Sequence, residues 1–194
     1  CGFGVRTSPM DRGTDQSMRI NEDVRKSVIF IGVLRPDGSF IPYGTGFLVL
    51  WFEEGKGFPY LVTAKHVVED AKHSGLPVVG RVNTRLGPAH VGTLVEEAWQ
   101  YHTTNKKSDV AVALSRLSFE TFDIKHVGLN DGCLSEKYVK DNDVGCGDEV
   151  FVTGLLTRHY GKTRNIPIVR MGNIAGMPDE LVDLGSGPIK FLAG

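Results

Sequence analysis

Short apolar runs separated by turn-forming residues dominate the chain from position 28 onward. The first run, Val28–Leu34, is rich in valine and isoleucine and is soon followed by Pro36, Asp37 and Gly38. Such a run, closed by residues that favour a tight turn, is typical of a buried β-strand. Runs of the same kind follow at Phe40–Tyr43, Gly46–Phe52, Phe58–Thr63, Leu76–Val82, His90–Val95, Val110–Leu114, Glu149–Thr153 and Ile166–Ile174. Their short lengths and close spacing predict an all-β chain, folded as a sandwich or a barrel.

The polar stretches between these runs indicate how the chain is divided. Residues 1–25 show little periodicity, and we expect a polar lead-in there, with a short helix near Asn21–Lys26. Residues 131–148 are rich in glycine and aspartate, which is typical of a linker. We therefore predict one β domain over residues 26–130 and a second over residues 149–194.

Composition and charge exclude several classes of protein. The chain is 41% hydrophobic and 23% charged, as ordinary globular proteins are. Its formal net charge of −1 offers no basic surplus for nucleic acid or for an acidic membrane surface. The longest apolar run, Phe47–Phe52, is far shorter than the roughly 20 residues that cross a bilayer. We expect no nucleic-acid partner and no membrane segment.

The cysteines bear on the cellular compartment. There are three, Cys1, Cys133 and Cys146, which is too few and too odd a number for a disulfide framework. A low cysteine count favours a reducing, cytoplasmic compartment. Because the chain begins at Cys1 rather than methionine, its native start is expected upstream, and the localisation stays open.

Three segments carry residue types suited to nucleophilic catalysis. Gly44–Val49 leads from small residues into an apolar strand, and Tyr60–Val68 is an apolar strand that breaks and presents His66. In Ser108–Leu114, Asp109 stands at the mouth of another apolar strand. A neutral imidazole can take a proton from a hydroxyl group and return it to a leaving amine. A carboxylate on the far side of the ring fixes its tautomer and stabilises the imidazolium.

The order of these motifs resembles that of trypsin-like (chymotrypsin-fold) serine proteases. In that family a G-[ST]-G-F strand precedes an [ST]-A-x-H segment, and a D-[VIL]-A strand comes later; all three patterns occur here in that order. Val144–Gly154 is similar to the G-D-x-V strand that opens the second barrel of the family, and Arg170–Ile174 to a later strand. The resemblance covers roughly residues 28–175.

The resemblance implies a fold, an activity and two site residues. The fold would be two antiparallel β-barrels stacked about a cleft, the second incomplete. The activity would be endopeptidase hydrolysis of a peptide or protein substrate by a Ser-His-Asp triad, with no cofactor. His66 would be the general base and Asp109 the residue that orients it. Cleavage specificity, biological target and oligomeric state are not addressed by the resemblance.

The nucleophile of the family, in a G-x-S-G loop, has no counterpart in the sequence. The nearest segment, Leu184–Pro188, contains Ser186 but lacks the residue between glycine and serine. Cys146, a candidate by analogy with viral cysteine proteases of this fold, stands before the second barrel would begin. Six strands and their connections need about 60 residues, more than Glu149–Gly194 provides. We therefore expect the nucleophile beyond Gly194.

Two alternatives to a serine protease stay open. A relative without a nucleophile would act as a peptide- or protein-binding module, which the fold alone permits. A metal cluster is the other alternative, because His66, Glu69 and His73 would share one face of a helix. Three ligands on two helical turns, with no supporting partner in the sequence, do not favour this interpretation, and we expect no metal.

Overall fold

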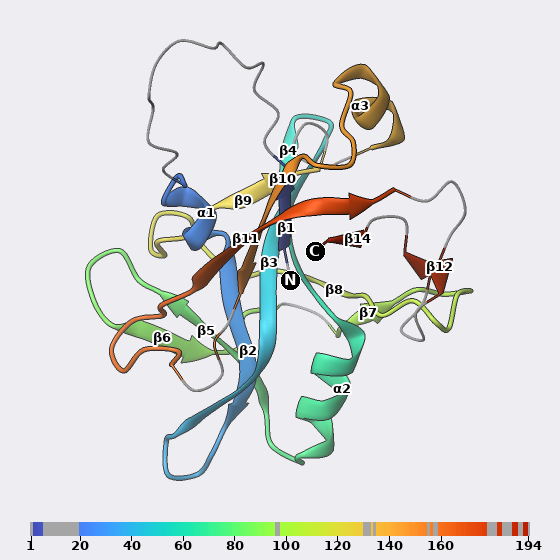
Figure 1. The fold of residues 1–194 in the computed structure, drawn as a ribbon. Coiled ribbons are helices and arrows are strands. Elements are labelled where there is room, and N and C mark those ends of the chain that lie inside the picture. Colours follow the sequence, from blue (N-terminus) through green and yellow to red (C-terminus); the bar gives the residue numbers. More distant parts are fainter. Residues whose placement is uncertain are drawn as a thin grey trace.

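The protein is built mostly of β-strands, as the apolar pattern predicted. The structure, a computed structural model, describes residues 2–5, 20–95, 98–129, 133, 135–154, 156, 159–177, 182–183, 188–189 and 192–193. These residues form one large sheet, a smaller sheet and a two-stranded ribbon, with three short helices at their margins (Figure 1). The β-rich class is therefore confirmed.

The large sheet contains the motifs that the sequence singled out. Its strands are β2 (Val28–Leu34), β3 (Phe40–Glu53), β4 (Lys56–Thr63), β5 (Val78–Asn83), β6 (Ala89–Gly92), β7 (Gln100–Tyr101) and β8 (Ala111–Leu114), with β9 (His126–Gly128) paired in parallel to β3. The antiparallel order is β6-β5-β2-β3-β4-β8-β7. No ladder joins β6 to β7 among the described residues, so the predicted closure of this sheet into a barrel is not seen in them. An isolated bridge between Val95 and Ser115 connects the chain after β6 with the end of β8.

The smaller sheet joins the two ends of the chain. Its order is β1 (Gly2–Val5), β10 (Glu149–Gly154), β11 (Ile168–Gly176) and β14 (Leu192–Ala193), and β12 (Val182–Asp183) pairs separately with β13 (Pro188–Ile189). Residues 2–5 were expected to lie in a polar lead-in, but they form a strand. Two glycines weaken the strand signal of this segment, and its hydrogen-bonding partner, β10, is far away in the sequence.

The core of the molecule belongs chiefly to the large sheet. Its main cluster of buried side chains consists of Ile29, Ile31, Leu48, Leu61, Val67, Val82, Leu94, Leu117 and Ile124. A much smaller cluster, of Val144, Val150 and Ile174, lies under the smaller sheet. Because hydrophobic stabilisation follows the apolar area removed from water, the large sheet is the stable body against which the rest packs.

The three helices differ in how well the sequence predicted them. Helix α1 (Asp23–Lys26) lies within the expected range, Asn21–Lys26. Helix α2 (Lys65–His73) buries Val67, Val68 and Ala71 against the large sheet. Helix α3 (Glu136–Asp141) lies in the segment expected to be a linker, where the hydroxyl of Ser135 accepts a hydrogen bond from the amide of Tyr138 and caps the helix. No helix in the described part of the chain combines the length and the apolar character that a membrane crossing requires.

A buried arginine holds the connection between β10 and β11 on the large sheet. Arg81, on β5, is only 4% exposed. Its guanidinium donates to Oδ1 of Asn165 at 2.8 Å, to the carbonyl of Lys162 at 3.0 Å and to the carbonyl of Tyr160 at 3.2 Å. The Asn165 side chain in turn donates to the carbonyl of Arg81 at 2.6 Å. We call Arg81 and Asn165 the interface clamp, because they join strand β5 to the segment that carries β11.

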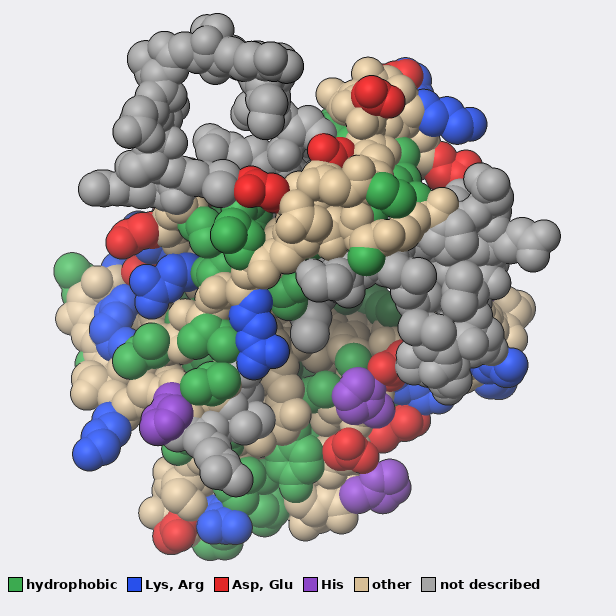
Figure 2. Space-filling model, viewed as in Figure 1, with side chains coloured by type: hydrophobic (Ala, Val, Ile, Leu, Met, Phe, Trp, Pro, Cys, Tyr) green, Lys and Arg blue, Asp and Glu red, His purple; other side chains and the backbone are tan. Residues whose placement is uncertain are grey.

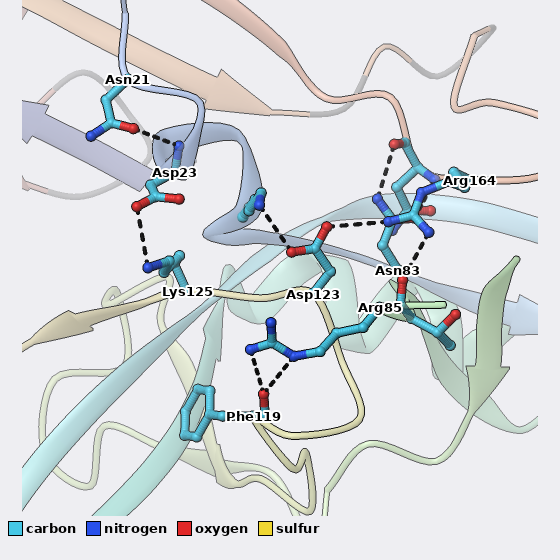
Figure 3. Close-up of polar contacts among 11 residues, drawn as sticks. Asn21, Asp23, Asn83, Arg85, Phe119, Asp123, Lys125 and Arg164 are labelled. Carbon is cyan, nitrogen blue, oxygen red and sulfur yellow. Dashed lines mark hydrogen bonds and ion pairs between the residues drawn. The ribbon is translucent and has the colours of Figure 1, made fainter. Parts of the chain in front are cut away.

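A second arginine extends this attachment (Figure 3). Arg164 donates to the carbonyl oxygens of Thr84 at 2.8 Å and Gly87 at 2.7 Å, and it pairs with Asp123 at 3.2 Å. Asp123 also binds Lys26 at 3.0 Å, so its carboxylate lies between two cations from distant parts of the chain. These bonds fix segment 159–167 along the edge of the large sheet.

Removing the guanidinium of the clamp should destabilise the whole protein. In Arg81→Met the side-chain volume is roughly kept, but one buried and two partly buried acceptors lose their donor, which should cost about 2–4 kcal/mol of unfolding free energy. Urea denaturation followed by tryptophan fluorescence measures this loss. The control is Arg25→Met, an exposed position on α1, which should change stability by less than about 0.5 kcal/mol. Equal stability of the two variants would contradict the role given to Arg81.

Candidate active site

The structure brings the two predicted site residues, His66 and Asp109, into direct contact. Nδ1 of His66 lies 2.6 Å from Oδ2 of Asp109, and the backbone amide of His66 donates to Oδ1 at 2.9 Å. Each carboxylate oxygen therefore has its own partner on the same residue. The bond to the backbone amide fixes the start of the side chain relative to Asp109, and the bond to Nδ1 fixes the orientation of the ring. With only one of these bonds the ring could still rotate.

Local structure explains why His66 lies where it does. Strand β4 ends at Thr63, whose hydroxyl donates to the carbonyl of Thr45 on β3 at 3.0 Å. Ala64, the residue just before α2, has an extended backbone, and its methyl side chain cannot cap the helix. The first amides of the helix consequently need an outside acceptor, and the carboxylate of Asp109 serves the amide of His66. A negative charge at this end of a helix is also favoured by the helix dipole.

The register of the sheet places Asp109. Strand β8 runs antiparallel to β4, and its first residue, Ala111, pairs with Thr63, the last residue of β4. Asp109 precedes β8 by two residues, so it lies beside the point where β4 gives way to α2. Forty-three positions of sequence separate Asp109 from His66, and this pairing brings them together.

The carboxylate of Asp109 is held in its ionised form. Partial burial alone would raise its pKa, but hydrogen bonds from the amide and the ring of His66, the charge of that ring and a hydrogen bond from the amide of Lys65 together outweigh burial. The pKa of Asp109 is therefore lower than its ordinary value of 3.8. An ionised acceptor at Nδ1 keeps a proton on that nitrogen and leaves the other ring nitrogen, Nε2, as the basic one.

A cavity of about 290 Å³ opens beside the histidine. It is lined by Tyr43, Gly44, Thr45, Ala64, His66 and Val67 from the large sheet and α2, and by Val152, Gly154, Ile168 and Arg170 from β10 and β11. The space-filling view shows this face hollowed between β11 and α2, with hydrophobic side chains within the hollow and a histidine near acidic side chains at its border (Figure 2). The side chain of His66 is 63% exposed, so a ligand in the cavity can reach it.

Close packing between Gly44 and α2 shapes one wall of this cavity. A Cβ atom at Gly44 would come within 2.5 Å of Cγ2 of Val67, the residue that follows His66. Only a residue without a side chain lets the first turn of α2 approach β3 this closely. The glycine of the Gly44–Val49 motif thus has a structural task that the sequence alone did not reveal.

The other candidate residues do not join this site. Ser186 lies outside the residues that the structure describes. Cys146 is exposed in the turn before β10, and no serine or cysteine occurs among the described residues that line the cavity. In the part of the chain that the structure describes, no three histidine, cysteine, aspartate or glutamate side chains gather as a metal site. Glu69 of the considered metal cluster instead lies 3.6 Å from Lys65.

Some residues of the site were missed by the sequence reading. Tyr43, Ile168 and Arg170 line the cavity, yet nothing in their local sequence sets them apart from other strand residues. Tyr43 belongs to β3 of the large sheet, whereas Ile168 and Arg170 reach the cavity from β11 of the smaller sheet. Comparison of the chain with protein-family models, with curated proteins and with solved structures gave no match.

The lowered pKa of Asp109 predicts a pH-dependent stability difference. The ionised carboxylate stabilises the fold at pH values above its ordinary pKa of 3.8, and this contribution is lost as the pH falls through the lower pKa of the folded state. Asp109→Asn should therefore lower Tm most at neutral pH, and the difference from the parent protein should shrink at pH values below about 4.

Thermal unfolding followed by circular dichroism between pH 2 and pH 7 measures this difference. Asp70→Asn, at an exposed position on the same helix, is the matched control and should shift Tm little at any pH. A loss of Tm in Asp109→Asn that stays constant over the whole pH range would contradict the ionised, hydrogen-bonded state of Asp109.

Proposed function

We propose that the protein is a serine endopeptidase of the trypsin-like class, in which His66 is the general base and Asp109 orients it. The observation that carries the proposal is the 2.6 Å contact between Nδ1 of His66 and the Asp109 carboxylate, made by an exposed ring at the border of a cavity. This is the arrangement that a Ser-His-Asp triad needs at its base.

The proposed reaction follows from the two states of the imidazole. Nε2 of His66 takes the proton of a serine hydroxyl while the serine oxygen attacks the carbonyl carbon of the peptide bond. The imidazolium then gives this proton to the amine that leaves, and an acyl-enzyme remains. Water, deprotonated by the same nitrogen, then attacks the carbonyl carbon of the acyl group; the bond to the serine oxygen breaks, and the imidazolium returns the proton to that oxygen. Throughout these steps Asp109 keeps the proton on Nδ1 and stabilises the positive ring, without taking the proton itself.

The proposal includes the double-barrel fold and a nucleophile that the described residues of the cavity lining do not supply. The bridge between Val95 and Ser115, with a hydrogen bond of 2.9 Å from the amide of Arg116 to the carbonyl of Leu94, supports a large sheet that curls towards closure. The smaller sheet would belong to the second barrel. The nucleophilic serine is proposed to follow Gly194 in the gene product, and the substrate to be a peptide or protein.

A second candidate function is a peptide-binding module without catalysis. It is favoured by one observation: the described residues that line the cavity include no serine and no cysteine. In this case the same cavity would hold a peptide side chain, and the contact between His66 and Asp109 would serve only to fix the start of α2. The two candidates differ in whether the intact gene product forms a covalent adduct.

Replacing the proposed base should abolish hydrolysis. In the intact gene product, His66→Ala should lower kcat for a fluorogenic casein substrate by roughly 10⁴-fold or more, because the serine hydroxyl loses its proton acceptor. Labelling of the serine by a fluorophosphonate probe should be lost with it. His73→Ala, an exposed histidine on the same helix, is the control and should keep both activities.

The outcomes separate the two candidates. Unchanged turnover in His66→Ala would refute the general base. If the intact product, correctly folded by circular dichroism, neither hydrolyses casein nor reacts with the probe, the endopeptidase proposal fails and the binding module takes its place.

A further inference from the structure

The cavity beside His66 contains one permanently charged side chain among the described residues that line it. This residue is Arg170, on β11; the other lining residues, apart from His66, are uncharged. No aspartate or glutamate is among the described residues that line the cavity, and the carboxylate of Asp109 is bonded to His66 rather than to Arg170. Its volume of about 290 Å³ lies at the lower end of the range for ligand pockets, roughly 300–1,000 Å³.

The sheet register explains why Arg170 faces the cavity. Arg170 pairs directly with Val152 of β10, and both residues line the cavity. Alternate residues of a strand share one face, and Ile168, two positions earlier on β11, lines the cavity as well. Gly154, two positions after Val152, completes this face. The smaller sheet therefore turns one consistent face towards His66, with the arginine on it.

The guanidinium of Arg170 is unpartnered within the described residues. It forms no ion pair and no hydrogen bond with any of them, whereas Arg81, Arg85 and Arg164 all donate to carbonyl or side-chain oxygens. Its nearest neighbours on the same face, Ile168 and Gly172 along β11 and Val152 across the ladder, carry no charge. Arg170 is exposed and thus free to meet an anion that comes from outside.

We infer that Arg170 binds a carboxylate of the ligand that occupies this cavity. In the proposed function the ligand is the substrate, and the carboxylate belongs to an acidic residue close to the peptide bond that is cleaved. A planar guanidinium takes a carboxylate through two parallel hydrogen bonds, which selects this group over an amide or an amine. A free carboxylate at the end of a peptide has the same chemistry as an acidic side chain.

The test measures binding, so that it does not depend on hydrolysis. The protein is the intact gene product carrying His66→Ala, which prevents turnover and leaves Arg170 in place. The probes are dye-labelled peptides with amidated ends that differ only in having glutamate, glutamine or lysine at one scanned position, and fluorescence anisotropy gives Kd. At the position that reaches the cavity, the glutamate peptide should bind about 5–10-fold more tightly than the glutamine peptide. This preference should weaken in 0.5 M salt.

A charge exchange at Arg170 gives the decisive comparison. Arg170→Glu should reverse the preference and bind the lysine peptide best, and Arg170→Lys should keep a reduced preference for glutamate. Arg25→Glu, on α1, changes net charge equally and should leave the preference as it was, which separates a local contact from long-range attraction. Circular dichroism of each variant establishes that it is folded. A preference for glutamate that survives in Arg170→Glu overturns the inference.

Two further arms assign the source of the carboxylate and separate this inference from the proposed function. A peptide with a free C-terminal carboxylate and no glutamate, if it binds through Arg170 more tightly than its amide, supports the terminal source. Equal Kd values for glutamate, glutamine and lysine at every position, and for acid and amide, overturn the inference even if the parent enzyme hydrolyses casein. If binding depends on Arg170 but the parent protein, with His66 in place, hydrolyses no casein and does not react with the fluorophosphonate probe, this inference is supported and the endopeptidase proposal is refuted.

Discussion

The geometry of the candidate site depends on a guanidinium group that is buried between strand β5 and the connection from β10 to β11. Burial lowers the pKa of Arg81, but an arginine is so basic that it keeps its charge at neutral pH. No carboxylate among the described residues neutralises it; its hydrogen bonds go to the Asn165 side chain and to the carbonyls of Tyr160 and Lys162. Segment 159–167 must therefore wrap around the charge. Because this segment leads directly into β11, the wrapping also sets the distance between the smaller sheet and His66.

The second constraint is the shared carboxylate of Asp109. A single acidic group accepts from the amide that begins α2 and from the imidazole on the same residue. A movement of the Asp109 carboxylate would therefore shift both the start of α2 and the orientation of the His66 ring. The helix has no capping residue of its own. The pairing of β4 with β8 instead places the carboxylate of Asp109, 43 positions away in the sequence, where it accepts a hydrogen bond from the first turn.

The sequence predicted what local patterns determine and missed what distant contacts determine. Strand β2 has the predicted bounds, since its apolar run and its turn residues are contiguous. The predicted strands Phe40–Tyr43 and Gly46–Phe52 proved to be one strand, β3, because pairing with β2 carries the backbone through Gly44 and Thr45. The contact of His66 with Asp109 could be expected only from the order of the motifs. A charged residue among apolar neighbours in β5 was a signal for Arg81 that went unused.

Because Gly44 packs against Val67, the positions around the cavity differ in how well they tolerate substitution. Any larger residue at position 44 would displace the first turn of α2, and with it the imidazole that α2 carries. Tyr43 is exposed and Ile168 is half-buried, so a change of size at either position meets less packing than at Gly44. In natural or engineered variants of this protein, substitutions at Tyr43 and Ile168 can therefore change the shape of the cavity, while the wall formed by Gly44 and Val67 beside the histidine stays the same.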